Sequence, residues 1–192
     1  DSLTTVFHTA AGREVRDGGG VSPDIEVKQE RLPNILFYLV RDNLIFDYAT
    51  DYCLKHPAIA SAKEFELTDA DYEEFKNKVK GADFKYDQQS EKILNTLKEA
   101  AEFEGYMKDA SDEFKALENK LKHNLDRDLD YFSKDIKKMI AEEIIKRYYY
   151  QEGAIIQQLK DDKDLDEAVK VLTNPERYQQ ILSVTAVTAK KE

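Results

Sequence analysis

The sequence predicts a mainly α-helical protein in which a multi-helix C-terminal domain follows a short N-terminal β-hairpin. The 192 residues include only 7 glycines and 4 prolines, whereas the helix-favouring Lys, Glu, Leu and Ala are abundant. Apolar residues recur every three or four positions between residues 111 and 151, which is the period of a helix. Residues 1–30 differ, since they hold four of the seven glycines and a run of β-branched and aromatic residues.

The first thirty residues predict a hairpin. Residues 4–9 favour a strand, Gly12 a turn, and residues 13–16 the returning strand. Three consecutive glycines, residues 18–20, predict a loop, because glycine is costly inside an element. Ser22-Pro23-Asp24 predicts a turn, and residues 25–27 alternate like a short strand. So few strands do not form a stable sheet alone, so we expect a neighbouring sheet or the helical part to cover them.

Three helices are predicted in the next part of the chain. Pro33 suits the first position of a helix, and the apolar residues after it predict one central, most buried helix that ends at His56-Pro57. Residues 68–71 resemble a capping box, Leu67 and Tyr72 have the spacing of a hydrophobic staple, and Gly81 predicts the end of a helix over 69–80. A helix over 88–104 is expected to turn inward Ile93, Leu94, Leu97, Ala100 and Ala101.

The longest apolar stripe begins at Ser111 and continues to about Gln151. It fits either one long helix or two helices broken near Asn124. A further helix is expected through Leu165 and Leu172, and Asn174-Pro175 opens a last short helix that ends near Leu182. We therefore expect strands in residues 1–30, a helical domain over 31–183 and a flexible tail over 184–192.

Charge and cysteine content exclude several classes of protein. The chain has 29 basic and 39 acidic residues, for a net charge of -10, and the basic residues are interleaved with acids. A phosphate backbone repels such a chain, so a nucleic-acid partner is not expected. Cys53 is the only cysteine, which excludes an internal disulfide. No apolar run approaches the ~18–20 residues of a membrane span, and no signal-peptide pattern begins the chain.

Two serine–lysine pairs, Ser90 with Lys92 and Ser133 with Lys137, could form a protease dyad by spacing alone. A Ser–Lys mechanism needs a lysine kept neutral by burial, and these pairs lie in charged helices without a glycine-rich turn for an oxyanion hole. We therefore expect no catalytic residue in this chain.

The metal-binding and cofactor patterns are incomplete. His8, His56 and His123 lack the spacing of metal ligands, and Cys53 lies among apolar residues as a small core residue does. Residues 126–130 begin like a calcium loop, but Tyr131 stands where glycine is required and Lys137 where glutamate is required. The run over 161–167 fails similarly, so both runs are interpreted as helix starts or solvated faces. We expect no metal-binding residue, no cofactor-binding residue and no cofactor.

Two further features favour structural roles. No strand–loop–helix pattern with Lys-Ser or Lys-Thr follows the three glycines, so a turn is favoured over an anion site. Tyr148, Tyr149 and Tyr150 point in different directions around a helix. We expect at least one of them in the core and at least one exposed, and an exposed tyrosine cluster can anchor an interface.

Two motifs resemble a known family. Thr4-Thr5-Val6-Phe7-His8-Thr9-Ala10-Ala11-Gly12-Arg13, followed by Gly20-Val21-Ser22-Pro23-Asp24-Ile25, resembles the T-T-x-x-Y/F-x-T-x-x-G-R and G-I-x-P-D-I/V segments of the carboxy-terminal processing proteases, peptidase family S41. Arg147-Tyr148-Tyr149-Tyr150-Gln151-Glu152-Gly153-Ala154 is similar to a stretch in the helical C-terminal extension of Bacteroidetes-type members. The expanded glycine loop, the run over 160–164 and Asn174-Pro175 also resemble those members.

The resemblance implies the C-terminal, non-catalytic region of a bacterial serine endopeptidase in the periplasm or cell envelope. The family's Ser–Lys dyad would lie before Asp1, so no catalytic residue is assigned in this sequence. The implied partners are upstream protease and PDZ-type domains of the same protein, together with protein or peptide substrates. Residues 1–30 would complete the protease sheet, and the helical domain would serve assembly, substrate access or regulation.

The alternative hypothesis is a non-enzymatic helical interaction or self-association module, whose partner would be a second copy of the chain in a homo-oligomer. The long stripe between Phe114 and Ile144 motivates it, because such stripes can pair between chains. The charged positions beside the stripe are irregular, which favours packing within one chain.

Overall fold

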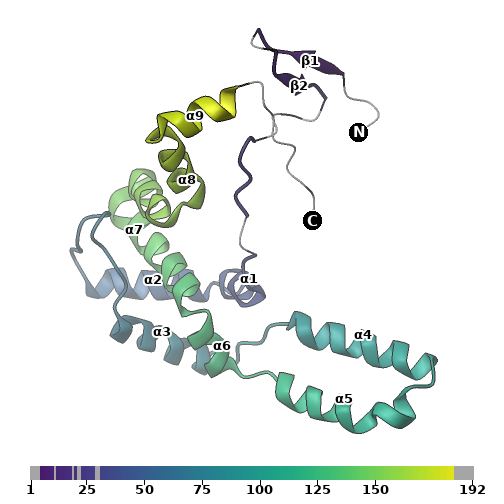
Figure 1. Ribbon diagram of the computed structural model, residues 1–192. Helices are drawn as coiled ribbons and strands as arrows, with labels where there is room; N and C mark the ends of the chain where they lie inside the picture. Colours follow the sequence, from purple (N-terminus) through teal and green to yellow (C-terminus); the bar gives the residue numbers. More distant parts are fainter. Residues whose placement is uncertain (1–4, 11, 19, 21–22, 29–30, 184–192) are drawn as a thin grey trace. The chain divides into compact units, whose positions relative to one another are not determined.

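A computed structural model describes residues 5–10, 12–18, 20, 23–28 and 31–183 (Figure 1). Within these residues the chain forms a two-stranded antiparallel sheet and nine α-helices, which confirms the predicted fold class. The chain groups into two compact units, Asp1–Glu30 with Leu159–Glu192 and Arg31–Gln158. No described helix combines the length and the apolar character needed to cross a bilayer.

The predicted hairpin is confirmed. Strand β1 (Val6–His8) pairs antiparallel with β2 (Glu14–Arg16), and Phe7 lies opposite Val15. The amide of Gly12 donates to the Thr9 carbonyl at 2.8 Å, which closes the turn where Gly12 has φ 82°. Gly18 and Gly20 also have positive φ, as a glycine loop requires, while Thr4, Gly19 and Ser22 lie outside the described residues. The predicted strand over 25–27 is wrong, because no described strand pairs with this segment.

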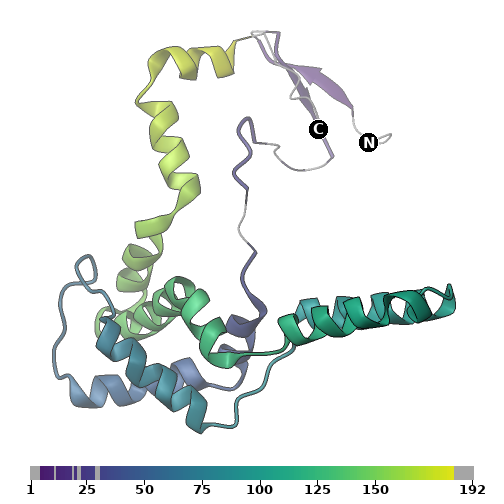
Figure 2. The same cartoon turned by 60° about the horizontal axis from the view of Figure 1, so that its bottom comes forward.

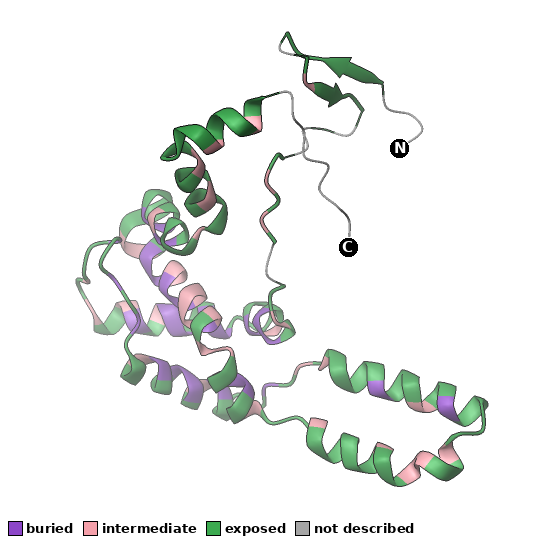
Figure 3. Ribbon diagram, viewed as in Figure 1, coloured by how far each residue is buried: buried purple, intermediate pink, exposed green. Residues whose placement is uncertain are grey.

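The larger unit, Arg31–Gln158, is entirely helical apart from its connections (Figure 2). The helices are α1 (Asn34–Arg41), α2 (Leu44–Lys55), α3 (Asp69–Gly81), α4 (Gln89–Phe103), α5 (Met107–Leu121), α6 (Leu125–Tyr131) and α7 (Ser133–Gln158). The main pairings join α2 to α1, α3 and α7, α6 to α3 and α7, and α4 to α5. One apolar core is built mainly by α1, α2, α3, α6 and α7, with the segments beside α3, as Figure 3 shows.

The single helix expected before His56 is two helices. Asn43 has φ 59°, in the left-handed region that ends a helix, and its amide donates to the Val40 carbonyl at 3.0 Å. Asparagine tolerates this conformation better than other residues with a side chain, so the chain turns between α1 and α2. Pro33 is the residue before α1 and not its first residue. Both helices supply fully buried residues, including Leu39 and Ala49, but Val40 is 48% exposed and Phe46 55% exposed. The predicted burial of this segment is therefore confirmed for one side of each helix only.

The capping box predicted for α3 is confirmed. The Thr68 hydroxyl accepts from the Asp71 amide at 3.1 Å, and the Asp71 carboxylate accepts from the Thr68 amide at 3.2 Å. Both donors would otherwise lack a partner inside the helix. Leu67 and Tyr72, the expected staple residues, are both buried.

The inward face predicted for α4 is largely exposed. Leu94 and Ala101 are buried, but Ile93 is 59% exposed and Leu97 51% exposed, and Ala100 is also exposed. The physical reason is that α4 has one main packing partner, α5, so only the side toward that helix is covered.

The long stripe forms three helices. Asn124 caps α6 by accepting from the Arg127 amide at 3.0 Å, which supports the expected break at this position. A second break follows at Phe132, between α6 and α7, and the sequence pattern did not predict it.

Helix α7 is kinked at Tyr150, whose φ of 53° and ψ of −150° are not helical. Hydrogen bonds on both sides of the kink bind the connection between α2 and α3. Tyr148 donates to the His56 carbonyl, Tyr149 to the Ala60 carbonyl at 3.1 Å, and Gln157 to the carbonyls of Ala62 and Phe65, both at 2.9 Å. In a straight helix the residues before and after Tyr150 would face other directions, and they could not all reach these carbonyls. We therefore infer that the hydrogen bonds offset the backbone strain at Tyr150.

Replacing Tyr150 by glycine is expected to raise the free energy of unfolding by about 1 kcal/mol. Glycine adopts positive φ without steric cost, which outweighs its larger entropy loss on folding. The Tyr150 side chain is 78% exposed, so little packing is lost. Urea unfolding followed by circular dichroism measures the change. Tyr150→Ala, which keeps the strain, should stay near the parent stability, and equal effects of the two substitutions would contradict this account.

The described residues of the smaller unit form the hairpin, the extended segment over 23–28 and the last helices. A short 3-10 turn (Leu159–Asp161) leads into α8 (Lys163–Leu172), and α9 (Pro175–Leu182) follows. Asp162 and Asn174 cap these helices, and Pro175 opens α9 as expected. The contacts group α8 and α9 with the N-terminal segment, although the sequence placed them in a helical domain over 31–183. The predicted domain boundaries stay a prediction, and the tail over 184–192 lies outside the described residues.

Candidate functional site

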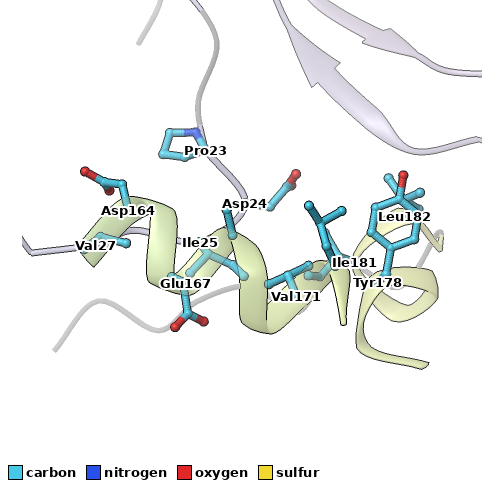
Figure 4. A pocket seen from close by; sticks show the side chains of 12 residues that line it. Pro23, Asp24, Ile25, Val27, Asp164, Glu167, Val171, Tyr178, Ile181 and Leu182 are labelled. Carbon is cyan, nitrogen blue, oxygen red and sulfur yellow. The ribbon is translucent and has the colours of Figure 1, made fainter. Parts of the chain in front are cut away.

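An apolar groove of about 390 Å³ lies in the smaller unit, between the extended segment over 23–27 and the pair α8–α9 (Figure 4). Ile25 and Val27 form one side, and apolar side chains of the two helices form the other. The groove can therefore hold apolar side chains, but the described residues that line it include no serine, cysteine, histidine or lysine that could act on a substrate. The residues from the helices are Asp164, Glu167, Ala168, Val171, Leu172, Tyr178, Ile181 and Leu182.

Two of the carboxylates at this groove are held in ion pairs. Asp24 pairs with Arg13 of the hairpin turn. Glu167 accepts from Arg177 at 2.6 Å and from Lys170 at 3.3 Å. Hydrogen bonds from these two cations lower the pKa of Glu167 below its ordinary value. Because these charges are compensated, the binding character of the groove is apolar.

The hairpin presents apolar side chains on a very small sheet. Val6 is 41% exposed, Phe7 52% and Val15 41%. Phe7 and Val15 are cross-strand neighbours, so they lie on the same face. Among the described residues, each strand is paired on one edge only. A two-stranded hairpin of this kind is marginal alone, so both its apolar face and its open edges suit addition to a larger sheet.

The lysines of the two serine–lysine pairs are both held in ion pairs. Lys92 donates to Asp87 at 2.6 Å, and that hydrogen bond raises the pKa of Lys92 above its ordinary value. A lysine base needs the opposite shift. Lys137 donates to Asp69 at 2.5 Å, also as an ion pair. Ser90 is exposed and Ser133 half-buried.

The three histidines lie in different segments of the chain, His8 in β1, His56 at the end of α2 and His123 between α5 and α6. His8 and His123 are exposed, whereas His56 stacks on Tyr52 with ring centroids 4.0 Å apart. Cys53 is half-buried at the edge of the core. Within the part of the chain that the structure describes, no group of three or more His, Cys, Asp or Glu residues could hold a metal ion.

The acidic run that begins like a calcium loop is the start of α6, and each aspartate binds a different neighbour. Asp126 pairs with Lys80, and Asp130 accepts at 2.6 Å from the buried Lys76. Asp128, itself only 5% exposed, accepts from Tyr86 at 2.5 Å and from Gln88 at 2.8 Å. Burial, and then the hydrogen bond to Asp128, raises the pKa of Tyr86. These carboxylates join α6 to α3 and to the segment before α4.

The Arg147–Ala154 motif joins α7 to α2 and to the connection after it. Arg147 donates to the Phe46 carbonyl at 3.1 Å and to the Thr50 hydroxyl at 3.2 Å, and its guanidinium lies over the Phe46 ring. Tyr148 is half-buried, whereas Tyr149 and Tyr150 are exposed. An exposed tyrosine was expected and is confirmed, but none of the three is fully buried. The Arg147–Ala154 motif is visible in the sequence, but its partners Phe46 and Thr50, about a hundred residues earlier, are not. No sequence pattern indicates the apolar groove beside α8 and α9.

Comparison with known proteins supplies the family. Residues 35–172 match the family model described as "Probable PDZ-protease, C-terminal helical domain". No curated protein and no solved structure matches the chain. The matched region runs from the second residue of α1 to the last residue of α8. The chain therefore belongs to the family of C-terminal helical domains of probable PDZ-proteases.

Proposed function

We propose that the chain is the non-catalytic C-terminal region of a bacterial S41-type serine endopeptidase whose Ser–Lys dyad lies upstream of Asp1. Residues 1–30 complete the sheet of the protease domain, and the helices govern assembly, substrate access or regulation. The motif over residues 4–25 supports the S41 type, and through it a periplasmic or envelope location. The family match supports a protease as the parent protein.

One observation carries the role of the N-terminal segment. The hairpin exposes Phe7 and Val15 side by side. Within the described residues, each of its two strands pairs only with the other, so the outer edge of each strand is open. Burial of that face against a neighbouring sheet would contribute about 2 kcal/mol or more, on the scale of a buried Val or Phe side chain. The apolar groove beside α8 and α9 offers a second contact surface for the same upstream domains or for a polypeptide substrate.

The chain alone is expected to show no proteolysis of an unfolded protein substrate. The physical reason is that the lysines of the two candidate pairs, Lys92 and Lys137, are held in ion pairs, whereas a lysine base must be neutral. Fluorescent casein gives the readout, with an active serine protease as the positive control. Turnover that disappears when any residue of this chain is replaced would overturn the proposal. The coding sequence upstream of Asp1 supplies an independent check, since a PDZ-like segment with a serine and a lysine is expected there.

A further inference from the structure

Helix α4 has an apolar face that no described residue covers. Ile93 and Leu97 lie one turn apart and are 59% and 51% exposed. Thr96 and Ala100, on the same face, are also exposed. Leu94 and Ala101, about a quarter of a turn around the helix from this face, are buried, and α4 packs on α5. The apolar surface of α4 is therefore wider than the part that α5 covers.

The exposed face is uncharged, and charges of opposite sign lie along one of its edges. Lys92 and Glu99 are seven residues apart, which is about two helical turns, so they lie along the same edge of the face. Lys98 lies on the other side, where it donates to Glu118 of α5 at 2.6 Å. Within the described residues Glu99 has no ion pair. The face thus combines an apolar strip with a cation near one end and an anion near the other.

We propose that this face of α4 binds the same face of a second copy of the chain, with the two helices antiparallel. A two-fold axis between antiparallel helices brings the same edge of each helix together, with the start of one beside the end of the other. Lys92 of each copy then faces Glu99 of the other, and Ile93 of each packs on Leu97 of the other. Thr96 and Ala100 are small enough for close approach of the two helices.

The charge pattern favours this occupant and this orientation. A parallel pair would bring unlike edges together and leave Lys92 and Glu99 without these partners. An unrelated apolar partner would use Ile93 and Leu97 but would not require a seven-residue spacing of opposite charges. The interface is self-complementary, as a two-fold dimer requires. Its apolar centre is small, so the dimer should form in the micromolar range.

Analytical ultracentrifugation of the 192-residue chain tests the proposal. At about 100 μM the parent chain should be largely dimeric. The double substitution Ile93→Asp and Leu97→Asp should raise the dissociation constant at least about 100-fold, because it places four carboxylates in an apolar contact. Leu54→Asp is the matched control, since Leu54 is 81% exposed on α2, and it should leave the dimer intact. A monomeric parent, or a dimer that tolerates the double substitution, overturns the proposal.

Charge reversal tests the orientation without disturbing the apolar strip. Lys92→Glu and Glu99→Lys should each weaken the dimer by at least about threefold, since each breaks two symmetric ion pairs. The two reversals combined in one chain should restore the parent affinity. Failure of the combined variant to recover, with helix content unchanged by circular dichroism, overturns the antiparallel pairing. Lys92 also binds Asp87 in the monomer, so Asp87→Asn serves as the control for that contact and should not weaken the dimer.

Discussion

Replacement of Gly153 by alanine is expected to lower the free energy of unfolding by about 1–3 kcal/mol. In an ordinary helix interior the same change stabilises by roughly 0.5–1 kcal/mol, so even the sign of the effect is informative. A methyl group at Gly153 would lie 2.4 Å from Cβ of Tyr149 and 2.8 Å from Cγ2 of Ile145. Neither atom is the end of a flexible side chain, so the kinked backbone itself would have to move.

Gly81→Ala is the matched control for this experiment. Gly81 ends α3, and an added Cβ there meets no atom within 4 Å. Its substitution should be neutral or slightly stabilising. Urea unfolding followed by circular dichroism compares the two variants with the parent chain. A Gly153→Ala variant as stable as Gly81→Ala would show that α7 runs straight through Tyr150 in solution.

Local chemistry explains which elements the sequence predicts. The hairpin, the capping box at Thr68 and the start of α9 at Asn174-Pro175 each depend on residues that are neighbours in the sequence. The break between α1 and α2 at Asn43 is not predicted, because the apolar pattern continues across it, even though asparagine often ends a helix. The kink at Tyr150 had no local signal. It depends on carbonyl groups about ninety residues earlier, in the connection after α2.

The same limit applies to the candidate sites. Sequence spacing was enough to reject the calcium loop, because Tyr131 stands in place of glycine. It could not reveal what the aspartates bind, since Lys80, Tyr86 and Lys76 are more than forty residues away. Periodicity also predicts that Ile93 and Leu97 face the core, because an apolar stripe shows which residues are apolar and not how many partners a helix has. In the structure α4 packs mainly on α5, so both side chains are exposed, and the proposed dimer is built on them.

Replacement of Asp128 by alanine is expected to lower the free energy of unfolding by about 3 kcal/mol. Its side chain is 7% exposed, and one oxygen accepts from both Tyr86 and Gln88. Hydrogen bonds to an ionised group are worth about 1.5–3 kcal/mol each, and removal of the acceptor leaves both donors without this partner. The helix start itself should remain, because Asn124 still caps α6.

Asp126→Ala provides the comparison within the same turn of helix. Asp126 is 64% exposed and pairs with Lys80 at the surface, so its loss should cost less than about 1 kcal/mol. Both substitutions remove one negative charge near the start of α6, so their difference isolates the buried hydrogen bonds of Asp128 from the helix dipole. Tyr86→Phe combined with Asp128→Ala should cost less than the sum of the two single changes, because the partners are shared. Equal destabilisation by Asp126→Ala and Asp128→Ala in urea unfolding would mean that the aspartates act only through charge at the helix start.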